Sequence, residues 1–214
     1  AGPSLVLDAD PAPPALPPNL PPLAESDDFV RRRAGGLSSD AAFQEWLKQE
    51  SLIARLSAAV SRIAHGGVPR DIFAAFAPKG RFRVVKKSGR TFADPASYAR
   101  YDAFAAMVAG VDAVAAAKLF TELQPLFDAA LRGLGEKNPS ALATLLAANR
   151  ELTEAPMLGD DADLAEGKKG IGWVYADERL ENMSLAQKQI MRMGPKNQAA
   201  MQAKLRALTL ALAN

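Results

Sequence analysis

Residues 51–67 read SLIARLSAAVSRIAHGG, and this stretch decides the fold class. Its apolar side chains recur with the 3.6-residue period of a helix: Leu52, Ile53, Leu56, Ala59, Val60 and Ile63. Ser51 suits the position that caps a helix N-terminus, and Gly66-Gly67 ends the pattern as glycine ends many helices. The stretch therefore predicts an amphipathic helix whose apolar face packs on other helices.

Start and stop signals predict further helices on both sides. Upstream, Ser26 begins a helix that Gly35-Gly36 ends, and residue 38 or 39 (both serine) caps a second. Downstream, the predicted helix starts are Asp94-Pro95, Asp112, Asn138-Pro139, Ser184 and Pro195. The first of these helices should run to about Gly110. Pro125 should kink or interrupt the helix that follows Asp112.

One segment departs from the helical period. Residues 82–86 are typical of a strand, residues 87–90 of a turn containing glycine, and Thr91 begins a return strand. Two strands alone are marginally stable, so the hairpin should pack on helices or gain residues 171–175 as a third strand. Residues 154–170 are acidic and predict a mobile loop. We therefore predict a mainly α fold, a compact multi-helix bundle with a small antiparallel β-hairpin or three-stranded sheet.

Proline sets the domain boundary. Eight of the fifteen prolines fall within residues 1–22. Because proline fixes φ and lacks a backbone N–H, an extended polyproline II spacer is expected there. We predict a proline-rich disordered linker over residues 1–24 and a single helical globular domain over residues 25–214. The alternative for the linker is a ligand of a proline-reading groove, although no arginine flanks its PxxP patterns.

The composition excludes several kinds of site. The 214 residues include no cysteine and one histidine, His65. A disulfide scaffold, a thiolate metal site and a site with two imidazoles are therefore impossible within this chain. Asp160, Asp161 and Asp163 lack the glycine and the terminal glutamate of a calcium loop. We predict no catalytic residues, no metal site and no cofactor.

The basic hairpin is the first candidate binding site. Its residues are Arg81, Arg83, Lys86, Lys87 and Arg90. They interleave with Phe82 and Phe92, a combination that can hold phosphates and stack bases. The alternative is a solvated edge whose charges discourage aggregation. Residues 151–167 carry six acidic residues and no base, and the sequence leaves open whether they pair with the hairpin within one molecule.

A short aromatic stripe is the second candidate. Tyr98, Tyr101 and Phe104 recur at helical spacing, which is typical of core packing. The alternative is that Tyr98 and Tyr101 line the rim of a pocket together with Arg100.

Two stretches carry a family resemblance. One reads DPASYARYD over residues 94–102, and the other runs from YADERLE (175–181) through SLAQKQ (184–189) to MRMGPKN (191–197). With ESD at 25–27 and FRVV at 82–85, they resemble the bacterial domain-of-unknown-function family 3014 over about residues 20–212. The resemblance implies a single-pass membrane protein of Gram-negative bacteria, with a membrane helix, a proline-rich spacer and then this domain. It implies no activity, cofactor or catalytic residue.

These observations lead to one functional hypothesis and two alternatives. We expect the soluble periplasmic part of a single-pass inner-membrane protein, tethered by an upstream helix that this chain does not contain. It would act as a non-enzymatic interaction module through charged surfaces, with an envelope protein or an anionic envelope component as partner. One alternative is a cell-envelope hydrolase that uses carboxylates, such as Glu178 and Glu181 one helical turn apart. The other is a binder of anionic polymer or nucleic acid through the basic hairpin, although an envelope location argues against nucleic acid.

Overall fold

The computed structural model describes residues 16–170 and 172–214. The helices are α1 Asp27–Ala34, α2 Ala41–Trp46, α3 Leu52–Ala64, α4 Pro95–Ala99, α5 Asp102–Ala109, α6 Ala113–Gly133, α7 Ala141–Thr153, α8 Glu178–Glu181, α9 Leu185–Met191 and α10 Pro195–Leu212. The strands are β1 Val84–Lys87, β2 Arg90–Ala93, β3 Leu164–Glu166 and β4 Trp173–Tyr175. The predicted mainly α fold with a small antiparallel hairpin is confirmed.

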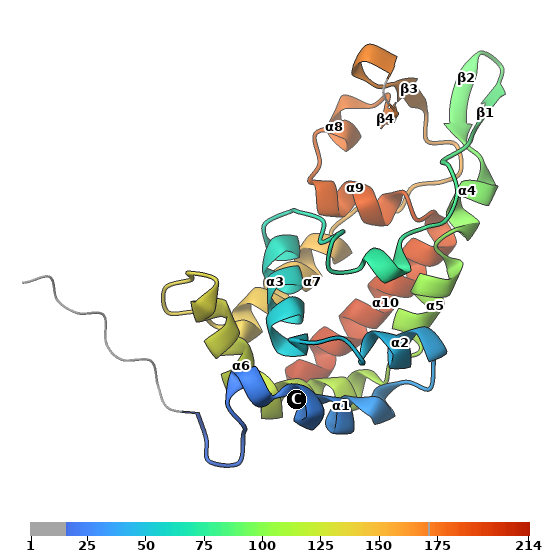
Figure 1. Cartoon of the computed structure of the whole chain (residues 1–214). Coiled ribbons are helices and arrows are strands. Elements are labelled where there is room, and N and C mark those ends of the chain that lie inside the picture. The colour runs from blue at the N-terminus through green and yellow to red at the C-terminus, as the bar shows by residue number, and fades with distance from the viewer. Residues whose placement is uncertain (1–15, 171) are drawn as a thin grey trace, which may run out of the picture.

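Two apolar clusters divide the molecule along its length (Figure 1). The first lies in the helical lower part, where α1, α3 and α6 supply most of its buried side chains. The second lies under the strands and involves α5, α9 and the start of α10. Helix α10 runs from the second cluster to the first and packs against α5, α6 and α7. One long helix therefore holds the two parts together.

The amphipathic helix predicted from residues 51–67 is α3. Leu52, Ile53 and Ala59 on its apolar face are almost fully buried, against α6 and α7. Burying a leucine or isoleucine side chain contributes roughly 1.5–3 kcal/mol. The face that the sequence pattern defines is thus the face that builds the first cluster.

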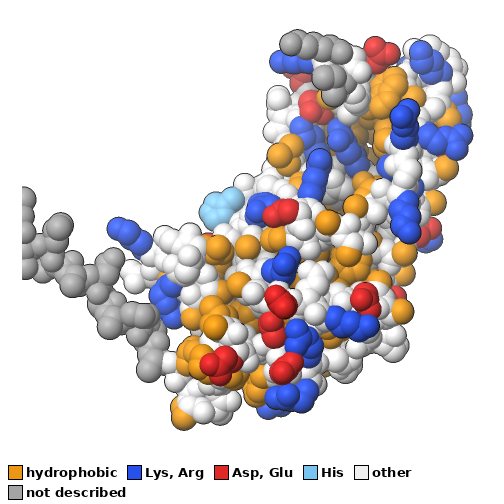
Figure 2. Space-filling model, in the orientation of Figure 1, with side chains coloured by type: hydrophobic (Ala, Val, Ile, Leu, Met, Phe, Trp, Pro, Cys, Tyr) orange, Lys and Arg blue, Asp and Glu red, His pale blue; other side chains and the backbone are white. Residues whose placement is uncertain are grey.

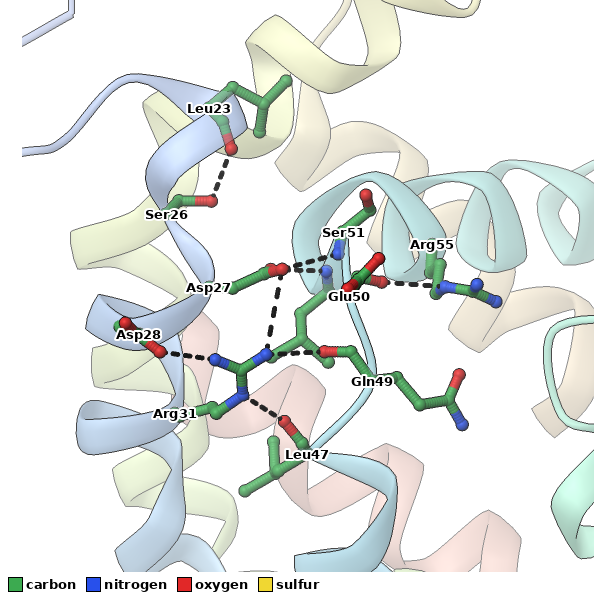
Figure 3. A network of polar contacts seen from close by, with 11 residues as sticks. Leu23, Ser26, Asp27, Asp28, Arg31, Leu47, Gln49, Glu50, Ser51 and Arg55 are labelled. Atoms are coloured by element: carbon green, nitrogen blue, oxygen red, sulfur yellow. Dashed lines mark hydrogen bonds and ion pairs between the residues drawn. The ribbon is translucent and has the colours of Figure 1, made fainter.

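Helix α3 is capped by Asp27 of α1 rather than by Ser51 (Figure 3). The Asp27 carboxylate accepts hydrogen bonds from the backbone N–H groups of Ser51 (2.7 Å) and Leu52 (2.9 Å). One turn further along α1, Arg31 donates from Nε to the Leu47 carbonyl (2.8 Å) and from Nη2 to the Gln49 carbonyl (3.0 Å). These bonds fasten α1 to the connection between α2 and α3.

Two other predicted caps were wrong. Asp40 caps α2, because its carboxylate accepts from the N–H groups of both Ala42 and Phe43, and residues 38 and 39 lie outside the helix. Ser140 caps α7 by accepting from the Ala143 N–H (3.2 Å), two residues beyond the predicted Asn138. In each case a later residue combines an extended backbone with a side chain that reaches the N–H groups of the first helical turn.

Two predicted helices also differ in extent. The helix expected from Asp94 to Gly110 is divided into α4 and α5 by a break at residues 100–101. In contrast, α6 is one element of 21 residues that continues through Pro125. Packing of α6 against both α3 and α10 compensates for the hydrogen bond that proline removes.

The strands form two antiparallel pairs rather than a three-stranded sheet. β1 pairs with β2 through a turn at Ser88-Gly89, where both residues have positive φ as in a type I′ turn. β4 pairs with β3, so residues 154–170 contain a strand instead of forming only a loop. Asp163, just before β3, accepts from Arg90 Nε (3.0 Å) and from the Thr91 N–H (3.3 Å). The basic hairpin and the acidic segment therefore pair within one molecule at this residue.

The predicted linker lies partly outside the described residues, which begin at residue 16. Within its described part, Leu20 is 8% exposed, and Leu16 and Leu23 also pack against the first cluster. Residues 23–25 form a turn of 3₁₀ helix just before α1.

Candidate functional site

A cavity of about 680 Å³ lies between the strands and helices α4, α5 and α9. Its walls carry many aromatic side chains: Phe73, Phe76, Phe82, Tyr98, Tyr101, Phe104, Trp173 and Tyr175. We refer to it as the aromatic cavity. In Figure 2, hydrophobic side chains are visible beside the β1–β2 hairpin at the upper right, with Lys and Arg side chains around them.

Several elements bring these rings together. Trp173 and Tyr175 are alternate residues of β4, so they project from the same face of the strand. Phe104 of α5 lies 5.6 Å from Phe76 and 6.4 Å from Phe73 between ring centroids. At these distances the tilted rings stabilise one another, and the wall is preformed.

Two arginines of the lining are held against the aromatic rings. Arg100 donates from Nε to the Ser97 carbonyl and from Nη1 to the Gly80 carbonyl, each at 3.0 Å. Its guanidinium lies 5.6 Å from the Tyr101 ring centroid. Arg192, which follows α9, donates from Nη2 to the Trp173 carbonyl (2.9 Å) and lies 5.8 Å from the Tyr175 ring. Both guanidiniums are thereby positioned before any ligand arrives.

Burial raises the pKa of two phenols of the lining above the ordinary value of tyrosine. It raises the pKa of Tyr175 to about 12, and the Arg192 guanidinium only partly offsets this effect. Burial also raises the pKa of Tyr98, as does the negative charge of Asp160. Both phenols are therefore neutral at physiological pH and can act as hydrogen-bond donors.

The connection between α9 and α10, together with the first turn of α10, fixes Tyr98. Gly194 has φ +83°, and its Cα lies so close to the Tyr98 side chain that an added Cβ would lie 2.7 Å from Tyr98 Cβ. Asn197, which is 3% exposed, donates from Nδ2 to the Tyr98 carbonyl (3.0 Å) and to Asp102 Oδ1 (2.8 Å). The sequence MRMGPKN carries much of the family resemblance. Its residues pack against Tyr98 and bind the Tyr98 carbonyl, and so they hold the wall of the cavity in place.

A family model described as "Protein of unknown function (DUF3014)" matches residues 52–209. The chain belongs to this family. The match begins at α3 and includes every described residue that lines the aromatic cavity, so the cavity lies wholly within the DUF3014 region. No curated protein and no solved structure matches the chain.

The structure places Tyr98, Arg100 and Tyr101 together on the wall of the aromatic cavity. Sequence reasoning missed Arg192 and Phe73, and it treated Trp173 and Tyr175 only as parts of a strand. Alternation of the aromatic residues at 173 and 175 was a local signal of a shared face. Nothing in the sequence places that face opposite α4 and α5.

The five residues of the basic hairpin divide into two groups in this DUF3014 domain. Arg83 pairs with Asp94 (3.3 Å), and Arg90 pairs with Asp163 while lying 5.0 Å from the Phe92 ring. Arg81, Lys86 and Lys87 are exposed, and they form no ion pair with the residues that the structure describes. Phe82 lines the aromatic cavity. The hairpin therefore offers three free cations, without the row of open aromatic faces that base stacking requires.

The carboxylates considered for hydrolysis are in α8. Burial alone would raise the pKa of Glu181, but hydrogen bonds from Lys188 Nζ (2.7 Å) and the Tyr175 N–H (3.0 Å) hold that pKa below its usual value. Glu181 is therefore ionised at neutral pH, with its oxygens already engaged. A general acid needs the opposite environment.

Within residues 16–170 and 172–214, no group of three His, Asp or Glu side chains could hold a metal ion. No single helix of this part is long and apolar enough to cross a membrane, and α5 and α6 reach that length and apolarity only together, as a pair bent by 74°.

Proposed function

We propose that this DUF3014 domain is a non-enzymatic binding module that holds a largely apolar ligand in the aromatic cavity. The observation that carries the proposal is the cavity itself. Its volume of about 680 Å³ lies within the roughly 300–1,000 Å³ typical of small-molecule sites. Aromatic walls with a few fixed polar groups are also typical of such sites.

The lining favours binding over hydrolysis. Among the described residues it contains no aspartate or glutamate. Glu181 lies outside the lining and is engaged by Lys188. A hydrolase that uses carboxylates would need one acid and one base beside the substrate. The cavity supplies neither.

Binding in the cavity can be tested with the neutral fluorophore N-phenyl-1-naphthylamine. We expect the folded chain to bind one molecule with a blue-shifted emission, because the aromatic walls exclude water. Ala162 is half-buried on the lining and lies outside any helix or strand, so Ala162→Trp should fill space and weaken binding at least tenfold. Ala165→Trp is the matched control, since Ala165 is exposed on β3 and away from the lining. Absence of binding, or equal losses in both variants, would refute the proposal.

We also propose that the domain lies in the periplasm, tethered by an upstream membrane helix. The support is the proline-rich stretch before residue 23 and the family resemblance of the sequence. Alkaline phosphatase, which is active only outside the cytoplasm, should be active when fused after Asn214 of the full-length protein. A cytoplasmic fluorescent reporter fused at the same position should be dark. The reverse pattern would exclude a periplasmic location.

The basic hairpin is the proposed contact with an anionic envelope component. The support is the exposure of Arg81, Lys86 and Lys87 and their freedom from ion pairs with described residues. Changing all three to glutamate should abolish co-sedimentation with phosphatidylglycerol vesicles at low salt, while the melting temperature changes little. As a control, Arg83→Gln, which removes a cation already paired with Asp94, should have a smaller effect. Unchanged co-sedimentation of the triple variant would remove the hairpin from the proposal.

A further inference from the structure

We propose that the aromatic cavity takes a single-chain anionic amphiphile, whose charged end binds Arg100 and Arg192 and whose hydrocarbon chain lies against the aromatic walls. This inference rests on the proposed function and adds the chemical class of the ligand. Four features of the cavity support it: the charge of its lining, its hydrogen-bonding groups, the state of the β4 edge and its volume.

All charged side chains among the described lining residues are positive. They belong to Arg70, Arg100 and Arg192, and the described part of the lining contains no carboxylate. Arg100 and Arg192 are half-buried, and they form no ion pair with described residues. A cation beside apolar walls is costly unless an anion accompanies it. Because the protein supplies no such anion at the wall, a ligand anion would relieve this cost.

The nearest carboxylates are engaged elsewhere. Glu181 is close enough to Arg192 for their charges to interact, but it accepts from Lys188 Nζ at 2.7 Å. Asp160 influences the phenol of Tyr98 and is itself exposed outside the lining. Neither replaces a partner for the two guanidiniums inside the cavity.

The hydrogen-bonding groups of the lining are mainly donors. A guanidinium carries five N–H donors and no acceptor. Arg100 uses Nε and Nη1 in bonds to backbone carbonyls, and Arg192 uses Nη2, so each retains further donors. Carboxylate and phosphate oxygens are the acceptors that guanidinium binds best.

The edge of β4 argues against a peptide as ligand. A peptide that adds a strand needs free backbone groups along that edge. The Tyr175 N–H already donates to Glu181 Oε2 (3.0 Å), and the Trp173 carbonyl already accepts from Arg192 (2.9 Å). A hydrocarbon chain has no backbone groups to satisfy, so it suits this wall better.

The volume is that of a small-molecule site. The cavity volume of about 680 Å³ lies within the roughly 300–1,000 Å³ that is typical of such sites. One hydrocarbon chain with a small headgroup belongs to this size class.

The test is displacement of N-phenyl-1-naphthylamine by amphiphiles of one chain length, each below its micelle concentration. Dodecanoate should displace the fluorophore at least tenfold more strongly than dodecan-1-ol, and dodecyltrimethylammonium should be weaker still. Lysophosphatidylglycerol with a dodecanoyl chain is the second anionic competitor in the experiment. Stronger displacement by dodecanoate would identify a free fatty acid as the source, and stronger displacement by the lysolipid would identify a membrane lipid.

The variant Arg100→Gln/Arg192→Gln assigns the anion preference to residues. It should bring dodecanoate to within about twofold of dodecan-1-ol, because the anionic headgroup loses both guanidinium partners. Lys86→Gln/Lys87→Gln removes equal charge outside the cavity and should keep the preference. If the double arginine variant does not fold, Arg192→Gln alone should reduce the preference by at least threefold.

The possible failures are distinct. If the folded chain does not bind the fluorophore, the proposed function fails and this inference with it. If the fluorophore binds but charged and neutral amphiphiles displace it equally, only this inference is overturned. Displacement by an extended apolar hexapeptide but not by dodecanoate would also overturn it, in favour of a peptide. An anion preference that survives loss of both arginines would refute their assigned role.

Discussion

Replacing Gly194 with alanine should lower the free energy of unfolding by at least about 3 kcal/mol. Gly194 has φ +83° and ψ 162°, a conformation that is essentially restricted to glycine and costs other residues about 1–3 kcal/mol. An added Cβ would also lie 2.7 Å from Tyr98 Cβ and even closer to Tyr98 Cγ. Tyr98 cannot retreat freely, because Asn197 binds its carbonyl. Urea denaturation of the wild-type and variant chains measures the difference.

Substitutions at two other glycines distinguish the cost of backbone strain from the cost of a steric clash. Gly135 has φ +88°, but an added Cβ would meet nothing within 4 Å, so Gly135→Ala should cost only the backbone strain of about 1–2 kcal/mol. Gly133, in the last turn of α6, has neither problem, and Gly133→Ala should be neutral or stabilising by up to about 1 kcal/mol. If Gly194→Ala were no more destabilising than Gly135→Ala, the close packing of Gly194 on Tyr98 would be unimportant.

This packing links stability to the candidate site. Tyr98 belongs to the wall of the aromatic cavity, and Arg100, two residues later, lies on the same wall. Gly194 packs against the Tyr98 side chain, and Asn197 binds the Tyr98 carbonyl, where α10 begins. Any substitution that displaces Tyr98 should therefore also change the cavity. The segment MRMGPKN (residues 191–197) therefore connects the long helix α10 to the wall of the cavity.

The helices could be predicted where their signals are local. Ser184 caps α9 with the reciprocal help of Gln187, three residues later, and the predicted start is confirmed. Pro195 opens α10, as its fixed φ favours. The period of α3 is local as well. Each of these signals depends on residues within one or two turns of each other.

Features that depend on distant residues could not be predicted. Asp27 caps α3 from 25 residues away, and no spacing rule connects the two. The pairing of β4 with β3 also depends on tertiary packing, because the sequence of a three-residue strand does not specify its partner. The same distinction between local and distant residues applies to the candidate site. Tyr98 and Tyr101 were found from helical spacing, whereas Arg192 lies almost a hundred residues away and joins them only in the folded chain.

Replacing Gln202 with methionine should lower the free energy of unfolding by about 2–3 kcal/mol. Gln202 is 1% exposed and donates from Nε2 to the carbonyls of Leu152 (3.0 Å) and Ala155 (2.8 Å). Carbonyls at the end of a helix such as α7 have no intrahelical partner. Methionine matches the length of glutamine but cannot donate, so the Leu152 carbonyl would lose its side-chain donor. Leaving a buried acceptor without a partner costs about 1–3 kcal/mol.

Gln198→Met should cost less, about 1 kcal/mol, although Gln198 is equally buried. Gln198 donates to the carbonyls of Ala155 (3.2 Å) and Pro156 (2.8 Å), but its own Oε1 is buried without a hydrogen-bond partner among the described residues. The substitution removes that unsatisfied oxygen together with the bonds, so the two effects partly cancel. Gln124→Met, at a half-buried position of α6 away from these carbonyls, is the control and should change stability by less than about 0.5 kcal/mol.

The two glutamines share one acceptor, and this sharing makes their effects non-additive. In either single variant the Ala155 carbonyl keeps one donor, but in the double variant it has none. The double variant should therefore be about 1–2 kcal/mol less stable than the sum of the single effects predicts. A double-mutant cycle by urea denaturation measures this coupling. Simple additivity would show that water reaches Ala155 once one glutamine is gone, and that the end of α7 is less tightly sealed against α10 than its burial indicates.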